Sequence, residues 1–288
     1  MYEIMKGYQK DDKLRNSFNA LALETFRLNF EDWYQNGFWR ENYIPYSIVI
    51  DGKVVANVSV NLTDMMYDGE IKKFIQLGTV MTAKGFRNQG LIRQIMREIE
   101  ADYKDKVDGM YLFANDSVLD FYPKFGFRKA VEYQYELPVE NETECQLEKI
   151  VMNNQDLWKH LLNVMSKNIF YGKFDMIGNH DLIIFYVTKF KQEDIYYHRE
   201  SDTFIIAEID EENVFIHNVF SRALDEIDKI TPLFGKEIKH ITLGFTPIDS
   251  EKYKMKELKE DDTTFFIKGE SLNIIKEEKM RIPSLSHA

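Results

Sequence analysis

The spacing of apolar and polar positions divides the chain into a regular series of expected elements. Apolar residues recur at helical spacing from Asp11 to Trp33, which predicts an N-terminal helix. Gly37 and Pro45 break that pattern. Two apolar runs then flank Asp51 and Gly52, a residue pair favoured in tight hairpin turns, and "IKKFIQLGTVMT" predicts a further strand. Turns this short predict antiparallel pairing of these strands.

The helical pattern returns in "LIRQIMREIEADY", where the apolar residues form one stripe. "GMYLFAN" is a short apolar run and predicts a strand that is buried on both faces. "DSVLDFYPKF" predicts a short helix that ends at Gly126, and "FRKAVEYQYEL" predicts a final alternating strand. The first half therefore has the expected order helix, antiparallel strands, helix, strand, helix, strand.

A charged stretch with few apolar residues, "PVENETE" at 138–144, predicts a linker and a division into domains 1–138 and 139–288. The second half repeats part of the element order. We expect a strand in "DLIIFYVTKF", a hairpin in "DTFIIAEIDEENVFIHNVF" and a helix from Ser221 to Gly235. Later strands are expected in "IKHITLGFTP" and "TTFFIKGE". The predicted fold class is α+β, with a moderate internal repeat.

Composition narrows the function classes. The 288 residues are 44% hydrophobic and 30% charged, which is typical of a soluble globular protein. The absence of a run of about 18 apolar residues predicts no transmembrane helix, and the N-terminal residues lack the apolar core of a signal peptide, so we expect a cytoplasmic location. The formal net charge of −11 argues against a nucleic-acid partner. The single cysteine, Cys145, excludes an internal disulfide.

The stretch "TAKGFRNQGLIRQIMREI" combines basic side chains, glycine and the start of a helix. A helix N-terminus offers unpaired N–H groups and a partial positive charge. Gly90 has no Cβ to hinder an anion, and Arg87 can add charge-assisted hydrogen bonds. A phosphate ester or pyrophosphate is the expected ligand. The stretch lacks the Gly-Lys-Ser/Thr that a Walker loop needs, and it lacks the third glycine of a dinucleotide-binding fingerprint. The remaining alternative is an ordinary surface loop that caps a helix.

These residues resemble the GNAT superfamily of acyl-CoA-dependent N-acyltransferases. The family signature Arg/Gln-x-x-Gly-x-Gly/Ala is matched by Arg87 and Gly90, while the bulky Ile92 departs from it. "RNQGLIRQIM" is instead similar to the Gly-Leu-x-Arg variant of the enhanced intracellular survival branch. "NDSVLDFYPKFGF", from Asn115 to Phe127, is similar to the family's Asn-x₆-Tyr-x₃-Gly-Phe block. The resemblance covers roughly residues 1–138 and implies a mixed, mostly antiparallel sheet flanked by helices.

The resemblance implies an N-acetyltransferase that moves an acetyl group from acetyl-CoA to a primary amine, by direct attack in a ternary complex. In the family, the loop N–H groups hold the CoA pyrophosphate, and the preceding strand lends backbone groups to the pantetheine arm. The implied cofactor-binding residues are Val80, Met81, Thr82, Arg87, Asn88, Gln89, Gly90, Leu91, Ile92 and Asn115. A backbone N–H near Val80 is the expected donor to the oxyanion.

Tyr122 is the candidate acid for the leaving thiolate, because a phenol is protonated at neutral pH. Its alternative role is that of a core aromatic. Asn115 is expected to bond the cofactor arm or to orient Tyr122, or to cap a helix. Cys145 is discounted as a covalent nucleophile, since neither a glycine at a helix start nor a histidine lies beside it in the sequence.

In the enhanced intracellular survival branch the terminal carboxylate acts as general base. The resemblance therefore suggests the carboxylate of Ala288, placed near Tyr122, as proton acceptor. Asp116 and Glu41 are further options for this role. The alternative is that residues 283–288 pack across the second domain.

The acceptor is expected to be a small-molecule or peptide amine. Phe30 to Tyr46 combines seven aromatic residues with Glu31, Asp32 and Glu41, which could form a wall for a cationic amine or serve as packing. The histidines are scattered, so no metal site is expected. The second half resembles a degenerate GNAT domain that covers the first and shapes the acceptor pocket; a dimerisation domain is the alternative and leaves a homo-oligomer open. Rival functions are a non-catalytic acyl-CoA sensor and a nucleotide-binding regulator.

Overall fold

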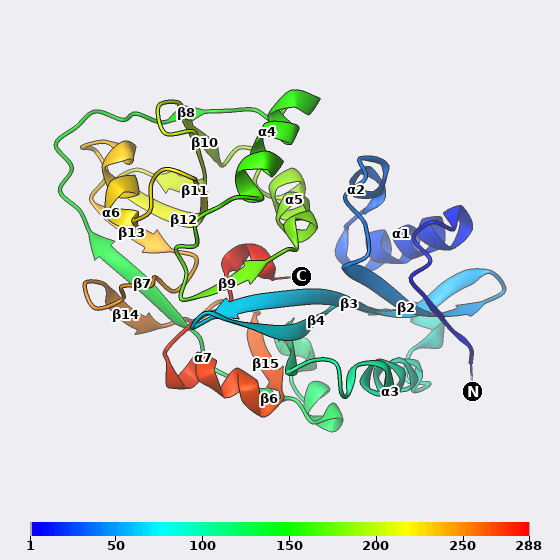
Figure 1. Cartoon of the computed structure of the whole chain (residues 1–288). Helices are drawn as coiled ribbons and strands as arrows, with labels where there is room; N and C mark the ends of the chain where they lie inside the picture. The colour runs from blue at the N-terminus through cyan, green and yellow to red at the C-terminus, as the bar shows by residue number, and fades with distance from the viewer. Residues whose placement is uncertain (1, 288) are drawn as a thin grey trace.

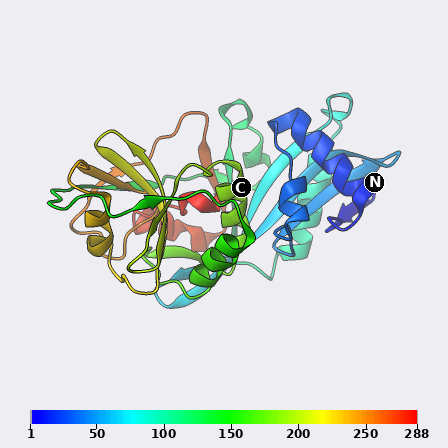
Figure 2. The same cartoon turned by 90° about the horizontal axis from the view of Figure 1, so that it is seen from above.

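Two mixed β-sheets lie next to each other, with helices packed on their faces (Figures 1 and 2). The computed structural model describes residues 2–287. Helices α1 and α2 lie on one face of the first sheet and α3 on the other (Figure 1). The helices are α1 (Asp12–Phe26), α2 (Glu31–Gln35), α3 (Leu91–Tyr103), α4 (Gln155–Met165), α5 (His180–Lys189), α6 (Ile227–Ile230) and α7 (Ile274–Glu277).

The first sheet has the order β1-β2-β3-β4-β5-β15-β6, and β9 pairs with β3 outside this path. Its strands are β1 (Ile4–Lys6), β2 (Tyr43–Ile50), β3 (Lys53–Tyr67), β4 (Glu70–Thr82), β5 (Gly109–Ala114), β6 (Arg128–Lys129), β9 (Phe174–Ile177) and β15 (Thr264–Lys268). The second sheet has the order β14-β7-β13-β12-β11-β10-β8. Its strands are β7 (Tyr133–Pro138), β8 (Glu148–Lys149), β10 (Ile195–His198), β11 (Thr203–Asp210), β12 (Asn213–Phe220), β13 (His240–Leu243) and β14 (Lys254–Glu257).

The elements expected from local patterns are confirmed where the pattern was strong. The hairpin of β2 and β3 turns at Asp51 and Gly52, whose φ angles are 49° and 72°, as a tight hairpin turn requires. Helix α3 and strands β4 and β5 occupy the expected segments, and β11 and β12 form the expected hairpin. The predicted α+β class with two sheets flanked by helices is confirmed.

The N-terminal helix is shorter than predicted. It ends at Phe26, because Arg27 adopts a left-handed conformation with φ 59° and its N–H closes onto Leu23 O. Asn19 then accepts a hydrogen bond from the Phe30 N–H at 3.0 Å, which holds the turn between α1 and α2. The apolar spacing continues through this turn because both helices pack on the same core.

The prediction of a strand in "DLIIFYVTKF" is wrong: this segment is α5. Asn179 caps it by accepting from the Leu182 N–H at 3.2 Å. Most of its side chains are buried, so burial on several sides produced a run without helical periodicity. "DSVLDFYPKF" forms two 3₁₀ turns, Asp116–Val118 and Tyr122–Phe125, rather than one helix. The expected helix from Ser221 to Gly235 is reduced to α6 and a 3₁₀ turn at Thr231–Phe234.

Each half of the chain contributes strands to both sheets. "FRKAVEYQYEL" is not one strand: β6 pairs with β15 in the first sheet, whereas β7 enters the second. Strand β15 comes from the second half of the chain and lies between β5 and β6. The division at residue 138 remains a prediction, but the first sheet is completed by residues far beyond it.

Strands β4 and β5 separate within the first sheet, and this separation positions the candidate site. They pair in parallel only from Phe74–Gly109 to Gln76–Tyr111. Beyond that point β4 continues to Thr82 and β5 to Ala114 without pairing with each other. Among residues 2–287, no helix is long and apolar enough to cross a membrane.

Candidate active site

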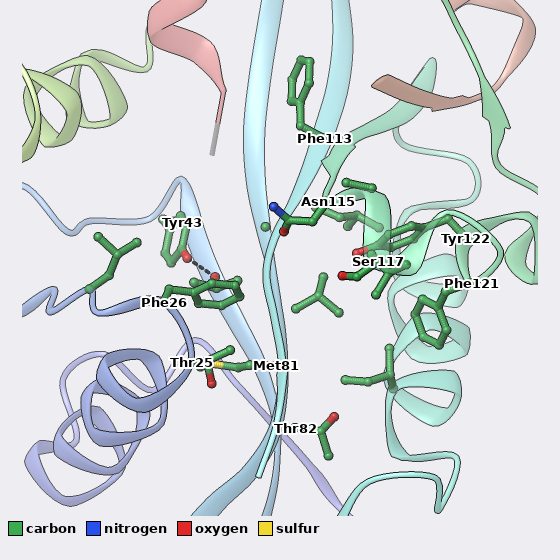
Figure 3. A pocket seen from close by; sticks show the side chains of 18 of the residues that line it. Thr25, Phe26, Tyr43, Met81, Thr82, Phe113, Asn115, Ser117, Phe121 and Tyr122 are labelled. Carbon is green, nitrogen blue, oxygen red and sulfur yellow. Dashed lines mark hydrogen bonds between the residues drawn. The ribbon is translucent and has the colours of Figure 1, made fainter. Parts of the chain in front are cut away.

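The separated ends of β4 and β5 open into a cavity of about 1220 Å³. Figure 3 shows β4 running through it, with Thr25, Phe26 and Tyr43 on one side and Ser117, Phe121 and Tyr122 on the other. The start of α3 lies at one end, and Phe113 and the C-terminal tail lie toward the opposite end (Figure 3). The lining comes from several segments: the end of α1 with Leu28, Phe30, Trp33 and Tyr43; residues 77–82 of β4; the loop and helix start at 86–93; uncharged residues and Lys124 within 113–125; Leu182, Phe185, Tyr186, Phe190 and Lys191; His217; and the C-terminal tail through Ser284 and Leu285.

A β-bulge distorts β4 at the centre of the cavity. Thr79 and Val80 together oppose the single residue between Asn57 and Ser59 of β3. Thr79 has φ 42°, a conformation that costs a β-branched residue about 1–3 kcal/mol. Two partners hold it there: Asn57 donates to the Thr79 carbonyl at 2.9 Å, and the Thr79 and Tyr43 hydroxyls are hydrogen-bonded.

This bulge lies where β4 has no partner in β5. Backbone groups near Val80 are therefore free of that ladder, as an oxyanion or pantetheine site requires. Val80, Met81 and Thr82 all line the cavity. Their assignment to the cofactor remains a prediction.

The loop before α3 presents its backbone to the same cavity. Gly90 caps the helix with φ 76°, without a side-chain hydrogen bond, and no described atom lies within 4 Å of the position of a Cβ. Arg87, Asn88 and Gln89 are exposed beside it. Arg87 donates through Nε to Thr82 O at 3.3 Å, which leaves its other guanidinium nitrogens available. The first N–H groups of α3 have no intrahelical partner, so this end can bind an anion.

Leu91 and Ile92 contribute differently from their neighbours. Leu91 is buried in the core on which α3 packs, and Ile92 is half-buried against that core. Both side chains are therefore committed to packing, and each can offer a phosphate only its backbone N–H. The bulky Ile92, unusual for the family signature, is accommodated by this packing.

Tyr122 is a core aromatic that also lines the cavity, and its role as the acid stays a prediction. Its side chain is only 5% exposed, and the ring packs against Phe121, Phe127 and Phe266. Its hydroxyl has no hydrogen-bond partner among residues 2–287, yet the residue lines the cavity. Burial raises the pKa of Tyr122 to about 12, so the phenol stays protonated across the physiological range.

Asn115 occupies the N-cap position of the 3₁₀ turn Asp116–Val118, but its side chain makes no capping hydrogen bond and none to Tyr122. Its side-chain amide donates to the Asp262 carboxylate at 2.9 Å, and the same carboxylate accepts the Asp116 N–H at 2.7 Å. The side chain therefore neither caps the turn nor bonds to Tyr122, and its expected contact with the cofactor arm stays a prediction. Asp262 belongs to the second half of the chain and fixes the end of β5 instead.

The acidic wall expected between Phe30 and Tyr46 does not form. Glu31 is bonded to Arg15 at 3.0 Å, and this bond lowers the pKa of the Glu31 carboxyl. Asp32 pairs with Lys189 at 3.0 Å, and the exposed Glu41 lies 4.0 Å from Lys10. None of the three carboxylates lines the cavity. The rings of the segment mostly form a buried cluster, including Phe30, Trp33, Trp39 and Tyr43, although three of these four also reach the cavity wall.

The second half supplies lining residues that no sequence pattern indicated. Helix α5 contributes Phe185 and Tyr186, followed by Phe190 and Lys191 just after its end. The sequence pattern predicts a strand here, so it does not indicate these residues. They reach the cavity because α5 packs beside the first sheet.

A polar network joins the tail to the second sheet at the cavity. His217 Nδ1 lies 2.9 Å from Ser284 Oγ, and His217 Nε2 lies 3.0 Å from Glu208 Oε1. Burial lowers the pKa of His217 to about 4, so its imidazole is neutral at pH 7. Gly244 makes this arrangement possible, because a Cβ there would collide with Ser284 Oγ.

The predicted carboxylate of Ala288 lies outside the described residues. The tail before it contacts the first sheet: Tyr111 donates to Ser286 O at 3.4 Å, and the His287 ring stacks on Phe113 with 3.8 Å between centroids. Residues 286–287 therefore pack against the first sheet and not only across the second domain. Cys145 is a free, exposed thiol, away from the cavity lining. Residues 2–287 contain no group of three His, Cys, Asp or Glu side chains arranged for a metal.

The chain is similar to known proteins in sequence and in structure. Residues 12–130 match the family model described as an acetyltransferase (GNAT) domain. A probable N-acyltransferase of Enterococcus faecalis V583 is similar in structure, at TM-score 0.58 and 15% identity over 99% of this chain and 73% of that one. Eis1 of Mycobacterium abscessus follows at 0.56 and 10%, over 92% and 73%. A GCN5-related N-acetyltransferase of Kribbella flavida gives 0.53 and 11%, over 92% and 71%. No curated protein sequence matches the chain.

Proposed function

We propose, from the match of residues 12–130 to the model of the GNAT acetyltransferase domain, that the protein transfers an acetyl group from acetyl-CoA to the primary amine of a small molecule or peptide. The observation that carries the proposal is the position of the Gly90 loop. It lies at one end of the cavity that opens where β4 leaves β5. A thioester donor needs both an anion site and a channel for its arm, and this arrangement offers the two together.

The donor would bind along β4. The pyrophosphate would meet the N–H groups at the start of α3, with Arg87 adding charge-assisted bonds. The pantetheine arm would pass the backbone of 80–82 and bring the thioester to the bulge at Thr79. Arg93 and Lys124, which also line the cavity, add positive charge on this side.

The chemistry then needs few side chains. The neutral amine attacks the thioester carbon, and the carbonyl oxygen becomes an oxyanion that a backbone N–H near Val80 stabilises. The C–S bond breaks as the amide forms. Tyr122 donates its hydrogen bond, and finally its proton, to the sulfur, so CoA leaves as a thiol. Because burial raises the pKa of Tyr122, the phenol stays protonated and can donate its hydrogen bond as charge develops on the sulfur.

The attacking nitrogen must lose one proton. Among the described residues, His217 beside Ser284 is the acceptor that we propose: it lines the cavity, and Glu208 at 3.0 Å would stabilise the imidazolium against the burial that lowers the pKa of His217. The carboxylate of Ala288 remains a second candidate. Glu41 pairs with Lys10 away from the cavity, and Asp116 does not line it either, so neither is retained.

The second half would complete the acceptor side. Its contributions, α5, His217 and the tail, meet the first sheet across the cavity from the donor loop. A degenerate GNAT-like domain that covers the first one and shapes the pocket therefore fits better than a separate dimerisation module.

The proposal is tested in two steps. Titration calorimetry with acetyl-CoA, ATP and NAD should give binding of acetyl-CoA alone; preference for ATP or NAD would favour the nucleotide-binding regulator. A thiol-release assay with acetyl-CoA and a panel of amines should then give amine-dependent CoA. Tight acetyl-CoA binding without amine-dependent release would instead favour a sensor that does not turn over.

A further inference from the structure

The cavity lining limits the kind of amine that the second half can admit. Of the residues that line it, none is an aspartate or glutamate within the described range 2–287. The chain as a whole carries 48 such residues against 37 lysines and arginines. An acid-free cavity in so acidic a chain is a specific property of this surface and not a reflection of composition.

We propose that the acceptor is a primary amine with an apolar, aromatic body and no further positive charge, as in an arylalkylamine. This inference rests on the proposed function and specifies its substrate class. The amine would enter at the end of the cavity that α5 and the tail form, opposite the Gly90 loop.

Charge argues against a polycationic acceptor. The charged groups that line the cavity are Arg87, Arg93, Lys124 and Lys191. Lys191 forms an ion pair with Glu208 and lies 3.7 Å from Asp194. Its charge is therefore balanced within the protein, and these two carboxylates are not available to bind a substrate ammonium. Each ammonium brought into this space without a partner carries a desolvation cost. Aromatic faces can offset that cost for one ammonium, but not for the several of a polyamine.

Two partly exposed aromatic rings line the cavity. Phe26 at the end of α1 is 38% exposed and Phe190 after α5 is 50% exposed, although both are large apolar residues. Both line the cavity. Phe190 continues inward through ring contacts with Phe185 at 6.1 Å and Tyr186 at 5.8 Å. Exposed apolar rings that lead into a cavity are typical of a site that receives an apolar ligand.

The interior offers polar groups for one amine only. The Tyr186 hydroxyl has no hydrogen-bond partner among residues 2–287, and burial raises its pKa, so it remains a neutral donor. His217 is also neutral, and Ser284 lies beside it. This group can hydrogen-bond to one nitrogen, whereas the rings would surround the rest of the molecule.

The same chemistry occurs in a free arylalkylamine and in a peptide that begins with an aromatic residue. The test therefore compares four acceptors at saturating acetyl-CoA: 2-phenylethylamine, a tetrapeptide with N-terminal phenylalanine, spermidine and kanamycin. We expect kcat/KM for 2-phenylethylamine to exceed that for spermidine and kanamycin by about tenfold or more. Preference for the peptide would assign the aromatic amine to a polypeptide and overturn the small-molecule part.

Two substitutions at Phe190 connect the result to the lining. Phe190→Ala should lower kcat/KM for 2-phenylethylamine about tenfold and leave acetyl-CoA affinity unchanged. Phe190→Glu places a carboxylate in the lining and should shift the preference toward spermidine. Phe170 is the matched control, since it is 37% exposed but does not line the cavity, so Phe170→Ala and Phe170→Glu should behave as wild type.

The outcomes separate the two levels of the argument. Turnover with spermidine or kanamycin in preference to 2-phenylethylamine overturns the acceptor class while the acyltransferase stands. If none of the four amines caused release of CoA, both the acceptor class and the proposed acyltransferase activity would be overturned. Binding of 2-phenylethylamine to the CoA-saturated protein, measured by calorimetry, provides a readout that does not need turnover: equal binding by wild type and Phe190→Ala would also overturn the inference.

Discussion

Replacing Gly90 with alanine separates the needs of the fold from those of the ligand. Gly90 has φ 76°, a conformation that costs an alanine about 1 kcal/mol or slightly more. No described atom lies within 4 Å of the position of the new Cβ, so no steric term adds to this cost. We therefore expect Gly90→Ala to lower the free energy of unfolding by about 1 kcal/mol and to fold normally.

The effect on the donor should be larger. The new methyl group would point into the open space at the start of α3, where the pyrophosphate would lie against the backbone. Displacing a phosphate from even one charge-assisted hydrogen bond costs about 1.5–3 kcal/mol. We expect the Kd for acetyl-CoA to rise by about 10- to 100-fold. Titration calorimetry measures the affinity, and chemical denaturation without ligand measures the stability.

Two other glycines serve as controls. Gly69, in the hairpin between β3 and β4, has φ 75° and equally open space around its Cβ, but it does not line the cavity. Gly69→Ala should therefore lose the same stability and keep its affinity for acetyl-CoA. Gly85 lies in the loop before α3 and does not have a positive φ. The Gly85→Ala protein should therefore keep the wild-type free energy of unfolding. If Gly90→Ala bound acetyl-CoA as tightly as Gly69→Ala, the assignment of a phosphate to this helix start would be wrong.

Three further predictions concern other positions. Arg87→Ala should weaken acetyl-CoA binding by about 1.5–3 kcal/mol at unchanged stability, and unaltered calorimetric affinity would exclude Arg87 from the site. Thr79→Gly should be more stable to denaturation than Thr79→Ala by about 1 kcal/mol, because both lose the Tyr43 hydrogen bond but only glycine relieves the φ of 42°; equal stabilities would contradict strain at the bulge. Burial raises the pKa of Asp175 to about 7, so its neutral form stabilises the fold below the unfolded pKa and this stability is lost as pH rises toward 7. Asp175→Asn should remove about 3 kcal/mol of the stability lost between pH 5 and pH 8, and an unchanged slope would refute that pKa.

The local structure around the Gly90 loop could be predicted from the sequence because its determinants are local. Arg87, Gly90 and the stripe of α3 lie within a few turns of chain, and the hairpin residues Asp51 and Gly52 determine their own turn. Tyr122 could be selected because residues 115–127 resemble a block of the GNAT family. Its double role as core ring and cavity hydroxyl could not, since spacing carries no information on which atoms are buried.

The acceptor side could not be predicted because it depends on contacts between distant segments. Phe190 reaches the cavity only because α5 is a helix, and its apolar, β-branched sequence favoured a strand. Ser284 meets His217 across 67 residues of chain. The Asp262 carboxylate that holds Asn115 belongs to a loop beside β15, a strand that completes the first sheet from the second half.

The central claim is that this cavity transfers an acyl group with Tyr122 as the acid. Single-turnover mixing of acetyl-CoA-loaded protein with an accepted amine, followed by quantification of CoA thiol and N-acetyl product, tests it most directly. The account predicts equal amounts of thiol and amide for wild type, and for Tyr122→Phe unchanged acetyl-CoA affinity with turnover slower by about 10²-fold or more. Thiol release without amide, or wild-type turnover in Tyr122→Phe, would contradict it.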